Sequence, residues 1–249
     1  MKTNFKKFKE HLKRNRLRYI LGLILFIFIG GVSFKEILDR HTRPRKSKIE
    51  YIVVHYTANP HPGATAKANA KYLQRKRNAG AHYLIDDNLD ENEGVIIGVP
   101  EDRVAFAVGD KKWFGFVPNP WHKGKIFNEN SLSFEMCLGG GRNDSLIIER
   151  TAMYVAWQLI DKSLYSSQSI VVNGKVYTRK VPDLGRVVRH HDVSGKQCPR
   201  FYYKDWEWNK KKEDEAFFVF KLKVQKYFDL RMKYERDLKK SRADLPFPI

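Results

Sequence analysis

Ile-Glu-Tyr-Ile-Val-Val-His-Tyr, at residues 49–56, is the stretch that decides the fold. Ile, Val and Tyr dominate it, and such a dense run of β-branched and aromatic residues is typical of a buried β-strand. The Asn, Pro and Gly residues between positions 59 and 63 then predict a turn. The strand therefore ends close to His55, and the tip of a buried strand presents side chains to a cleft.

Strand and helix patterns alternate after this strand. Further strands are predicted at 81–87, 94–100, 131–138 and 187–193. An Ala- and Lys-rich helix is predicted over 64–78 and an amphipathic helix over 147–165. This alternation indicates an α/β domain with a central mixed β-sheet flanked by helices. We expect the domain to cover residues 49–205, with a charged, mostly helical extension at 206–249.

The N-terminal end has the pattern of a membrane anchor. Residues 1–18 carry eight Lys and Arg residues against one acid, and residues 19–34 carry no charge. As a helix this run would span roughly 24 Å, which snorkelling and bilayer thinning can match to the membrane. The basic flank should stay cytoplasmic, and residues 35–48 then form a basic stalk. We therefore expect a single-pass protein of the cytoplasmic membrane, with its folded domain on the outer side, in the periplasm or cell wall.

Two other interpretations of the apolar run are open. A buried core helix would not explain the basic residues that precede it. A cleaved signal peptide fits the charge pattern, but Phe34-Lys35-Glu36 is a poor cleavage site because such sites have small residues. An uncleaved transmembrane signal anchor is the best fit.

The net charge of the chain limits the kinds of molecule that it is expected to bind. The 249 residues include 47 Lys and Arg against 28 Asp and Glu, and 47 − 28 gives a formal charge of +19. Such an excess calls for a polyanionic neighbour, such as nucleic acid, anionic lipid or a bacterial wall polymer. Nucleic-acid binding would rest on charge alone, because no recognised nucleic-acid motif accompanies it. We expect no nucleic-acid partner.

Residues 189–199 (RHHDVSGKQCP) concentrate groups that bind metals or move protons. A catalytic zinc site needs three protein ligands, drawn from His, Cys, Asp and Glu, and one open position for water. Two strand ends that bring His55 and His190 together, with Cys198 closing over a turn, would form such a site. A lone His at a strand end is more often structural, and it is the cluster that favours a metal site.

Four segments follow one another along the chain and together form a recognisable pattern: IVVHYTANP (52–60), AHYLIDD (81–87), SLSFEMC (131–137) and RHHDVSGKQCP (189–199). In this order they resemble the zinc-dependent N-acetylmuramoyl-L-alanine amidases, a family that includes phage amidase-type lysozymes and peptidoglycan recognition proteins. The resemblance covers about residues 49–205. It implies an α/β fold with Zn²⁺ at one edge of the sheet. It also implies cleavage of the amide between N-acetylmuramic acid and the first L-alanine of the peptidoglycan stem peptide.

The resemblance assigns the metal ligands. They would be His55, His190 and Cys198, because the family's second ligand is the His eight residues before the ligand Cys. Strand alternation agrees, since adjacent residues of a strand face opposite ways. His191 would then face solvent or the cell wall.

The resemblance also implies two catalytic residues that are not ligands. Glu135 matches the acid of the family's I-E-x-C strand motif and is the candidate general base. Lys196 matches the lysine two residues before the ligand Cys and would stabilise the oxyanion. The alternatives are a carboxylate paired with a basic residue and a solvated surface lysine. Where some members carry a tyrosine, this chain has Ala81, which places more weight on Glu135, and His82 is expected to be a core or supporting histidine.

Three smaller features remain. Cys137 should share the strand face of Glu135, so a Cys137–Cys198 disulfide is conceivable, although it would abolish the metal site. The helix of the extension carries a narrow apolar stripe, with which it would dock on the domain or pair with another chain. A loop rich in aromatic residues would stack on sugar rings or form a local core; its members are Trp113, Phe114, Phe116, Trp121 and His122.

Together these patterns predict a zinc-dependent N-acetylmuramoyl-L-alanine amidase that acts on peptidoglycan and is bound to the membrane by its N-terminal helix. The alternative function is a non-catalytic peptidoglycan-binding module. Loss of the ligand Cys is the usual mark of such members, and Cys198 is present. The pattern leaves the oligomeric state undetermined.

Overall fold

A computed structural model describes residues 42–75, 79–90, 94–108, 124–173, 175–202 and 208–243. The predicted cytoplasmic segment, the anchor at 19–34 and the aromatic loop at 113–122 lie outside these ranges. Within them, no helix combines the length and the apolar character needed to cross a membrane.

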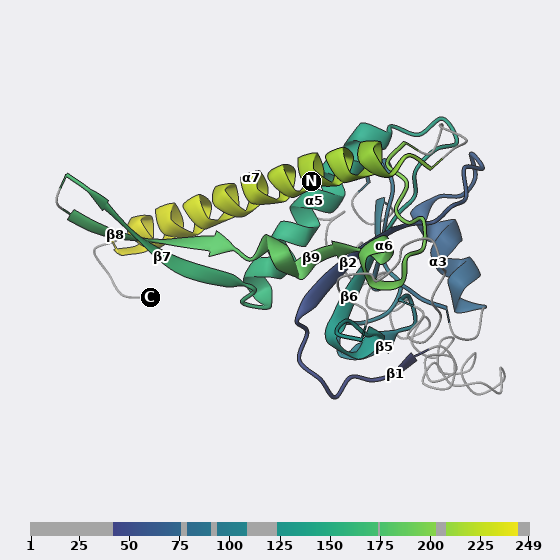
Figure 1. The fold of residues 1–249 in the computed structure, drawn as a ribbon, viewed down its shortest axis with the longest axis horizontal. Coiled ribbons are helices and arrows are strands. Elements are labelled where there is room, and N and C mark those ends of the chain that lie inside the picture. Colours follow the sequence, from purple (N-terminus) through teal and green to yellow (C-terminus); the bar gives the residue numbers. More distant parts are fainter. Residues whose placement is uncertain are drawn as a thin grey trace, which may run out of the picture. The chain divides into compact units, whose positions relative to one another are not determined.

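A five-stranded sheet forms the centre of the domain, with the strand order β4-β3-β6-β2-β9 (Figure 1). Its strands are β2 (Tyr51–Tyr56), β3 (Tyr83–Ile85), β4 (Val95–Ile97), β6 (Ser131–Met136) and β9 (Val187–Arg189). The neighbours from β3 to β9 are parallel, and β4 is antiparallel to β3. The predicted α/β domain with a central mixed sheet is confirmed.

Three longer helices accompany the sheet, α3 (Ala66–Gln74), α5 (Asp144–Asp161) and α7 (Lys210–Ala243). Side-chain caps set two of the starts: Thr65 accepts a hydrogen bond from the Ala68 amide at α3, and Asn143 accepts one from the Leu146 amide at α5. The short helices are η1 (Asn128–Asn130), η2 (Leu184–Arg186) and α6 (His190–Ser194). The first two predicted helices therefore exist, with ends shifted by a few residues.

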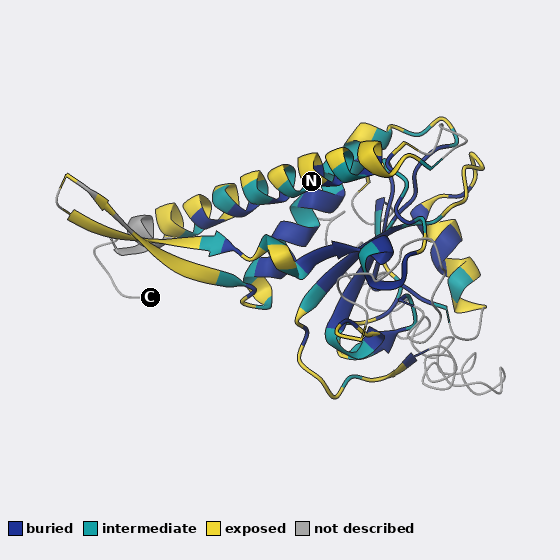
Figure 2. Ribbon diagram, in the orientation of Figure 1, coloured by how far each residue is buried: buried dark blue, intermediate teal, exposed yellow. Residues whose placement is uncertain are grey.

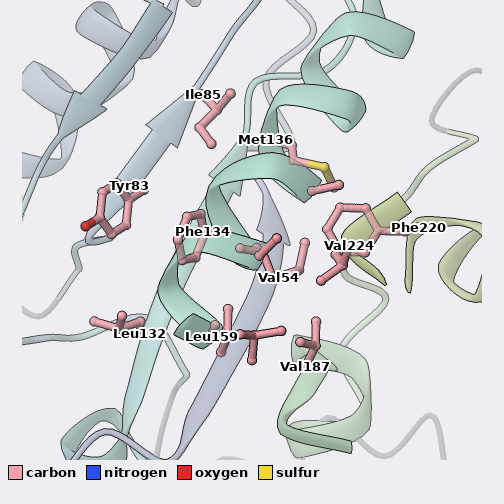
Figure 3. Close-up of a cluster of buried hydrophobic side chains, with 14 of the residues drawn as sticks. Val54, Tyr83, Ile85, Leu132, Phe134, Met136, Leu159, Val187, Phe220 and Val224 are labelled. Carbon is pink, nitrogen blue, oxygen red and sulfur yellow. The ribbon is translucent and has the colours of Figure 1, made fainter. Parts of the chain in front are cut away.

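The main core lies between one face of the sheet and the pair α5 and α7 (Figures 2 and 3). On β2, Ile52 and Val54 point into this core, whereas Val53 packs on the opposite face. On β6, Leu132, Phe134 and Met136 point into it. Side chains alternate along a strand, so His55 and Glu135 project from the face opposite α5 and α7.

The helix of the C-terminal extension docks on the domain, which was one of the two alternatives for its apolar stripe. The core-facing residues of α7 are Phe217, Phe220, Val224, Phe228 and Met232. Lys223 and Lys226 of α7 also pair with the carboxylate of Glu149 on α5. The compact fold therefore continues well beyond residue 205.

The stalk prediction is wrong from Thr42 onward. Strand β1 (Thr42–Pro44) pairs antiparallel with β5 (Arg103–Ala105). The Arg45 guanidinium then reaches backbone carbonyls far along the chain, including Glu101 at 2.9 Å and Ser131 at 3.1 Å. The polar, basic composition of the segment from Thr42 onward is typical of a linker, but these contacts make the segment part of the domain.

Two further elements differ from the sequence-based expectation. Strand β9 ends at Arg189, and His190 to Ser194 form the helix α6 instead of continuing the strand to residue 193. In addition, β7 (Tyr165–Val172) and β8 (Lys175–Pro182) pair as an exposed hairpin, which the sequence analysis did not predict. One ion pair, between Arg179 and Asp229 at 3.5 Å, links this hairpin to α7.

Candidate metal centre

Three buried side chains with metal-binding chemistry converge beside the carboxyl end of β2. They are His55, His190 and Cys198, and their ligand atoms all lie within 4.8 Å of one another. The Nδ1 atoms of the two histidines are 3.1 Å apart, and the Cys198 Sγ atom is 3.9 Å from His55 Nδ1. The structure thus brings together the three residues that the sequence predicts as ligands.

These separations suit one tetrahedral zinc ion. Zinc–nitrogen bonds of ~2.0–2.1 Å and a zinc–sulfur bond of ~2.3 Å place two nitrogens about 3.3 Å apart, and a nitrogen and a sulfur about 3.6 Å apart. A set of two imidazoles and one thiolate also matches the ligand preference of zinc. The residues present therefore fit the metal.

The outward nitrogen of His190 supports the same interpretation. His190 Nε2 lies 3.2 Å from the backbone oxygen of Val108. A carbonyl only accepts hydrogen bonds, so Nε2 carries the proton and Nδ1 keeps its lone pair for a cation. Metal-bound histidines in proteins are commonly oriented by such a carbonyl. His55 Nε2 is buried and has no hydrogen-bond partner among the residues that the structure describes.

Burial keeps both imidazoles neutral. It lowers the pKa of His190 to about 4, with the positive charge of Lys196 as a further cause. Burial also lowers the pKa of His55, assisted by His190. Neutral imidazoles are the form that binds metal.

Cys198 is a free, buried thiol. Burial and the nearby Glu135 raise its pKa, while a hydrogen bond from the Tyr56 backbone and the charge of Lys196 lower it. A coordinating metal deprotonates a thiol outright, and a thiolate in this position would be neutralised by that metal.

His191 differs from its prediction. It is 4% exposed, so it does not face solvent. Its Nδ1 atom lies 3.1 Å from the Lys196 carbonyl, and its ring is 5.1 Å from that of Trp208. The cause is α6: neighbouring helical residues point about 100° apart, so His190 turns toward His55 while His191 packs beneath the turn that follows.

Glu135 stands directly beside His55, because these residues are register partners in the parallel pairing of β6 and β2. Its Oε2 atom is buried without a hydrogen-bond partner among the described residues. Burial raises the pKa of Glu135 to about 7, against an opposing effect of Lys196. The carboxyl group can therefore exchange a proton near neutral pH.

Lys196 is exposed, in the turn between α6 and Cys198. Its positive charge acts to lower the pKa of His55, His190 and Glu135, and its backbone carbonyl accepts a hydrogen bond from the Cys198 amide at 2.7 Å. The structure thus gathers both predicted catalytic residues around the candidate metal centre.

Two neighbouring expectations have clear outcomes. Cys137 and Cys198 are both free cysteines, so the disulfide that was conceivable as an alternative to the metal site is not formed. Cys137 packs against α3, with Asn69 Nδ2 at 3.5 Å from its sulfur. His82 is a core histidine bonded to Ser133, as expected, and Ala81 packs in the same apolar cluster as Cys137.

The residues that anchor the ligand-bearing segment are not among those predicted from the sequence. Arg189 contacts Asp192 and Asp214, both at 2.8 Å, and Glu213 accepts a hydrogen bond from the Phe201 amide at 2.9 Å. Asp192, an acidic residue in the first turn of α6 whose carboxylate accepts a hydrogen bond from the Arg189 amide, is a weak sequence signal for this helix. The contacts from α7 leave no comparable trace in the sequence.

Comparisons with known proteins agree with this geometry. Residues 45–201 match the family model described as N-acetylmuramoyl-L-alanine amidase. The N-acetylmuramoyl-L-alanine amidase CwlL of Bacillus licheniformis is 28% identical over 179 residues, which cover 68% of this chain and 41% of CwlL. CwlH of Bacillus subtilis (strain 168), another N-acetylmuramoyl-L-alanine amidase, is 27% identical over 161 residues, which cover 63% of this chain and 49% of CwlH. The chain thus spans less than half the length of these curated relatives.

A solved structure shares the fold. The catalytic domain of XlyA superposes with a TM-score of 0.51 at 19% identity, over 74% of this chain and 92% of that domain. At this identity the likeness bears on the fold alone.

Proposed function

Because this chain belongs to the N-acetylmuramoyl-L-alanine amidase family, we propose that it hydrolyses the amide bond between N-acetylmuramic acid and L-alanine in peptidoglycan. The observation that carries the proposal is the convergence of His55, His190 and Cys198 beside Glu135. The alternative, a module that binds peptidoglycan without cutting it, has no feature of the described residues in its favour.

We propose that the bound metal is Zn²⁺, held by His55 and His190 through nitrogen and by Cys198 through sulfur. When bound, it supplies Lewis acidity and lowers the pKa of a coordinated water. The neutral imidazoles and the carbonyl of Val108 behind His190 support this assignment.

Glu135 is proposed to accept the proton of the attacking water. As the water oxygen bonds to the amide carbon, negative charge develops on the carbonyl oxygen, and Lys196 is proposed to stabilise it. Glu135 then returns the proton to the nitrogen of L-alanine as the carbon–nitrogen bond breaks. Burial raises the pKa of this carboxyl group to about 7 in the metal-free site, and a bound cation beside it would lower that pKa and favour the carboxylate that accepts the proton.

The test is digestion of purified peptidoglycan, with the products identified by mass spectrometry. The protein should release stem peptides with a free L-alanine amine, a chelator should stop the release, and added Zn²⁺ should restore it. Cys198→Ser should be inactive, whereas Cys137→Ser is a matched control, because that thiol is also buried but belongs to the cluster under α3. Binding without any cleavage by the zinc-loaded protein would favour the non-catalytic module.

We also propose that residues 19–34 anchor the chain in the cytoplasmic membrane, with the amidase domain outside. The support is the uncharged run and the basic residues before it. The full chain should resist alkaline extraction from membranes, and a C-terminal reporter should be active only outside the cytoplasm. A secreted form that begins near residue 35 would instead identify a cleaved signal peptide.

A further inference from the structure

The segment that carries two of the three proposed ligands is held from outside the family domain. His190 and Cys198 lie within residues 189–202, and this segment leaves the edge strand β9. The first turn of α7 contacts it near both ends. Helix α7 begins at Lys210, beyond the residues 45–201 that match the family model.

Arg189 makes the first connection, immediately before His190. Its side chain is 8% exposed, and its guanidinium forms ion pairs with Asp192 and with Asp214 of α7, each at 2.8 Å. The guanidinium also lies 5.0 Å from the centre of the Phe217 ring. A buried guanidinium requires such partners, and α7 supplies two of them, Asp214 and Phe217.

Asp192 connects the position of Arg189 to that of His190. Its carboxylate accepts a hydrogen bond from the Arg189 amide at 2.9 Å and three more from the Arg189 side chain, two of them from Nε. This arrangement starts α6 at His190 and therefore sets the direction of the His190 side chain.

Glu213 makes the second connection, just after Cys198. It is 3% exposed, and its carboxylate accepts hydrogen bonds from the amides of Phe201 at 2.9 Å and Tyr202 at 3.3 Å. The same segment is closed on itself by the His191 amide, which donates to the Cys198 carbonyl at 2.8 Å. Neighbouring residues of α7 thus hold the segment on both sides of its ligands.

We propose that Glu213 and Asp214 are positioning residues that hold His190 and Cys198 at metal-binding distance, and that α7 thereby raises the metal affinity of the site. Helix α7 can do so because its apolar face is buried in the main core, so its first turn has a fixed place. The inference rests on the proposed metal site. Groups that orient metal ligands are typically worth on the order of 10–100-fold in metal affinity.

The experiment is a titration of the metal-free full chain with Co²⁺ and Zn²⁺, followed by absorption spectroscopy and competition with a chromophoric chelator. Asp214→Asn and Glu213→Gln should each weaken metal binding on the order of 10–100-fold and change the cobalt spectrum. Asp214→Glu, which keeps the charge, should recover part of the affinity.

Glu149→Gln is the matched control. Glu149 also bonds α7 through its side chain, to Lys223, Lys226 and Tyr227, but it does so from α5 and at a later part of α7 than Glu213 and Asp214. This variant should bind metal like the parent chain, even if its thermal stability falls as much as that of Asp214→Asn.

The outcomes separate the two proposals. A parent chain that binds neither metal would refute the metal site itself. A parent chain that binds metal, together with folded Asp214→Asn and Glu213→Gln variants of unchanged affinity and spectrum, would overturn the role of α7 alone. If Glu149→Gln weakens metal binding as much as the other two variants, the loss of affinity reflects a general loss of stability. That result would also overturn the role of α7.

Discussion

His55 and His190 face each other with their Nδ1 atoms 3.1 Å apart, although 135 residues separate them in the chain. Their rings meet edge to face, with centres 4.7 Å apart. The Val108 carbonyl keeps the proton of His190 on Nε2, so its Nδ1 atom presents a lone pair to its neighbour. Such a pair of buried imidazoles needs a shared proton or a shared cation, and the sulfur of Cys198 beside them favours the cation.

The choice between His190 and His191 is the first prediction. His190→Ala should abolish binding of zinc, because it removes a proposed ligand. His191→Ala should keep stoichiometric zinc, because His191 turns away to the Lys196 carbonyl and to Trp208. Elemental analysis of the two purified variants decides the matter. An empty His191→Ala protein and a loaded His190→Ala protein would reverse the assignment.

Sequence alone was enough for much of the site. The apolar run before His55 predicts its strand, and two-residue alternation places Glu135 on one face of its own strand. His190 was selected partly on strand alternation, and that physical reason was wrong, because Asp192 caps the Arg189 amide and starts a helix. The assignment survives because a helix also separates adjacent side chains.

The misses have physical causes. Strand β1 has only three residues and includes Pro44, so nothing in its composition distinguishes it from a stalk; its partner lies about 60 residues away. The hairpin of β7 and β8 was detectable in principle, since Asn173-Gly174 between two β-branched runs is a turn signal. The apolar stripe of α7 indicated that this helix would dock on the domain or pair with another chain, and only its tertiary contacts decide between the two.

Arg45 provides the second prediction. Its guanidinium donates to the backbone carbonyls of Glu101, Ser131 and Arg103, the last two at 3.1 Å each, and also contacts His82. Arg45→Met should lower the free energy of unfolding by about 3 kcal/mol, because several half-buried acceptors lose a charged donor. Urea denaturation measures the change.

Arg43→Met is the control for this prediction. Arg43 lies in the same segment and pairs with Glu129 at 2.7 Å, but its side chain is 52% exposed. An exposed ion pair contributes less than about 1 kcal/mol. If both substitutions cost equally little, the segment before Ile49 behaves as the stalk that its composition suggested.

The third prediction concerns the pH dependence of folding stability, and it rests on His82. It is fully buried, and burial together with the charge of Arg45 lowers its pKa to about 3, although Glu101 acts in the opposite direction. In the unfolded chain a histidine titrates near pH 6.5, so between about pH 6.5 and pH 3 the unfolded state binds the extra proton. Stability should therefore fall as the pH falls through this window, by up to about 1.4 kcal/mol per pH unit for this group.

The measurement is urea denaturation of the metal-free protein at several pH values. His55 and His190 also have lowered pKa values, so the comparison that matters is between the parent chain and His82→Gln. The variant should show a shallower loss of stability toward acid. Superimposable curves for His82→Gln and the parent chain would show that His82 does not titrate as the structure indicates.

Glu135 separates metal binding from catalysis, and this is the last prediction. Its carboxylate lies beside His55 but is not among the three groups that converge as ligands, so Glu135→Gln, which has nearly the same shape, should keep the fold and the zinc content. Loss of a general base typically costs on the order of 10²–10⁴ in rate. The loss should appear in kcat more than in KM, since the proton moves in the transition state and not on binding. Lys196→Met should cost about 10²–10³ in kcat in the same assay, if its charge stabilises the oxyanion. Ala81, which stands where some family members carry a tyrosine, is buried and offers no side chain for chemistry. A zinc-loaded Glu135→Gln protein that cleaves peptidoglycan within a few-fold of the parent rate would remove Glu135 from the mechanism.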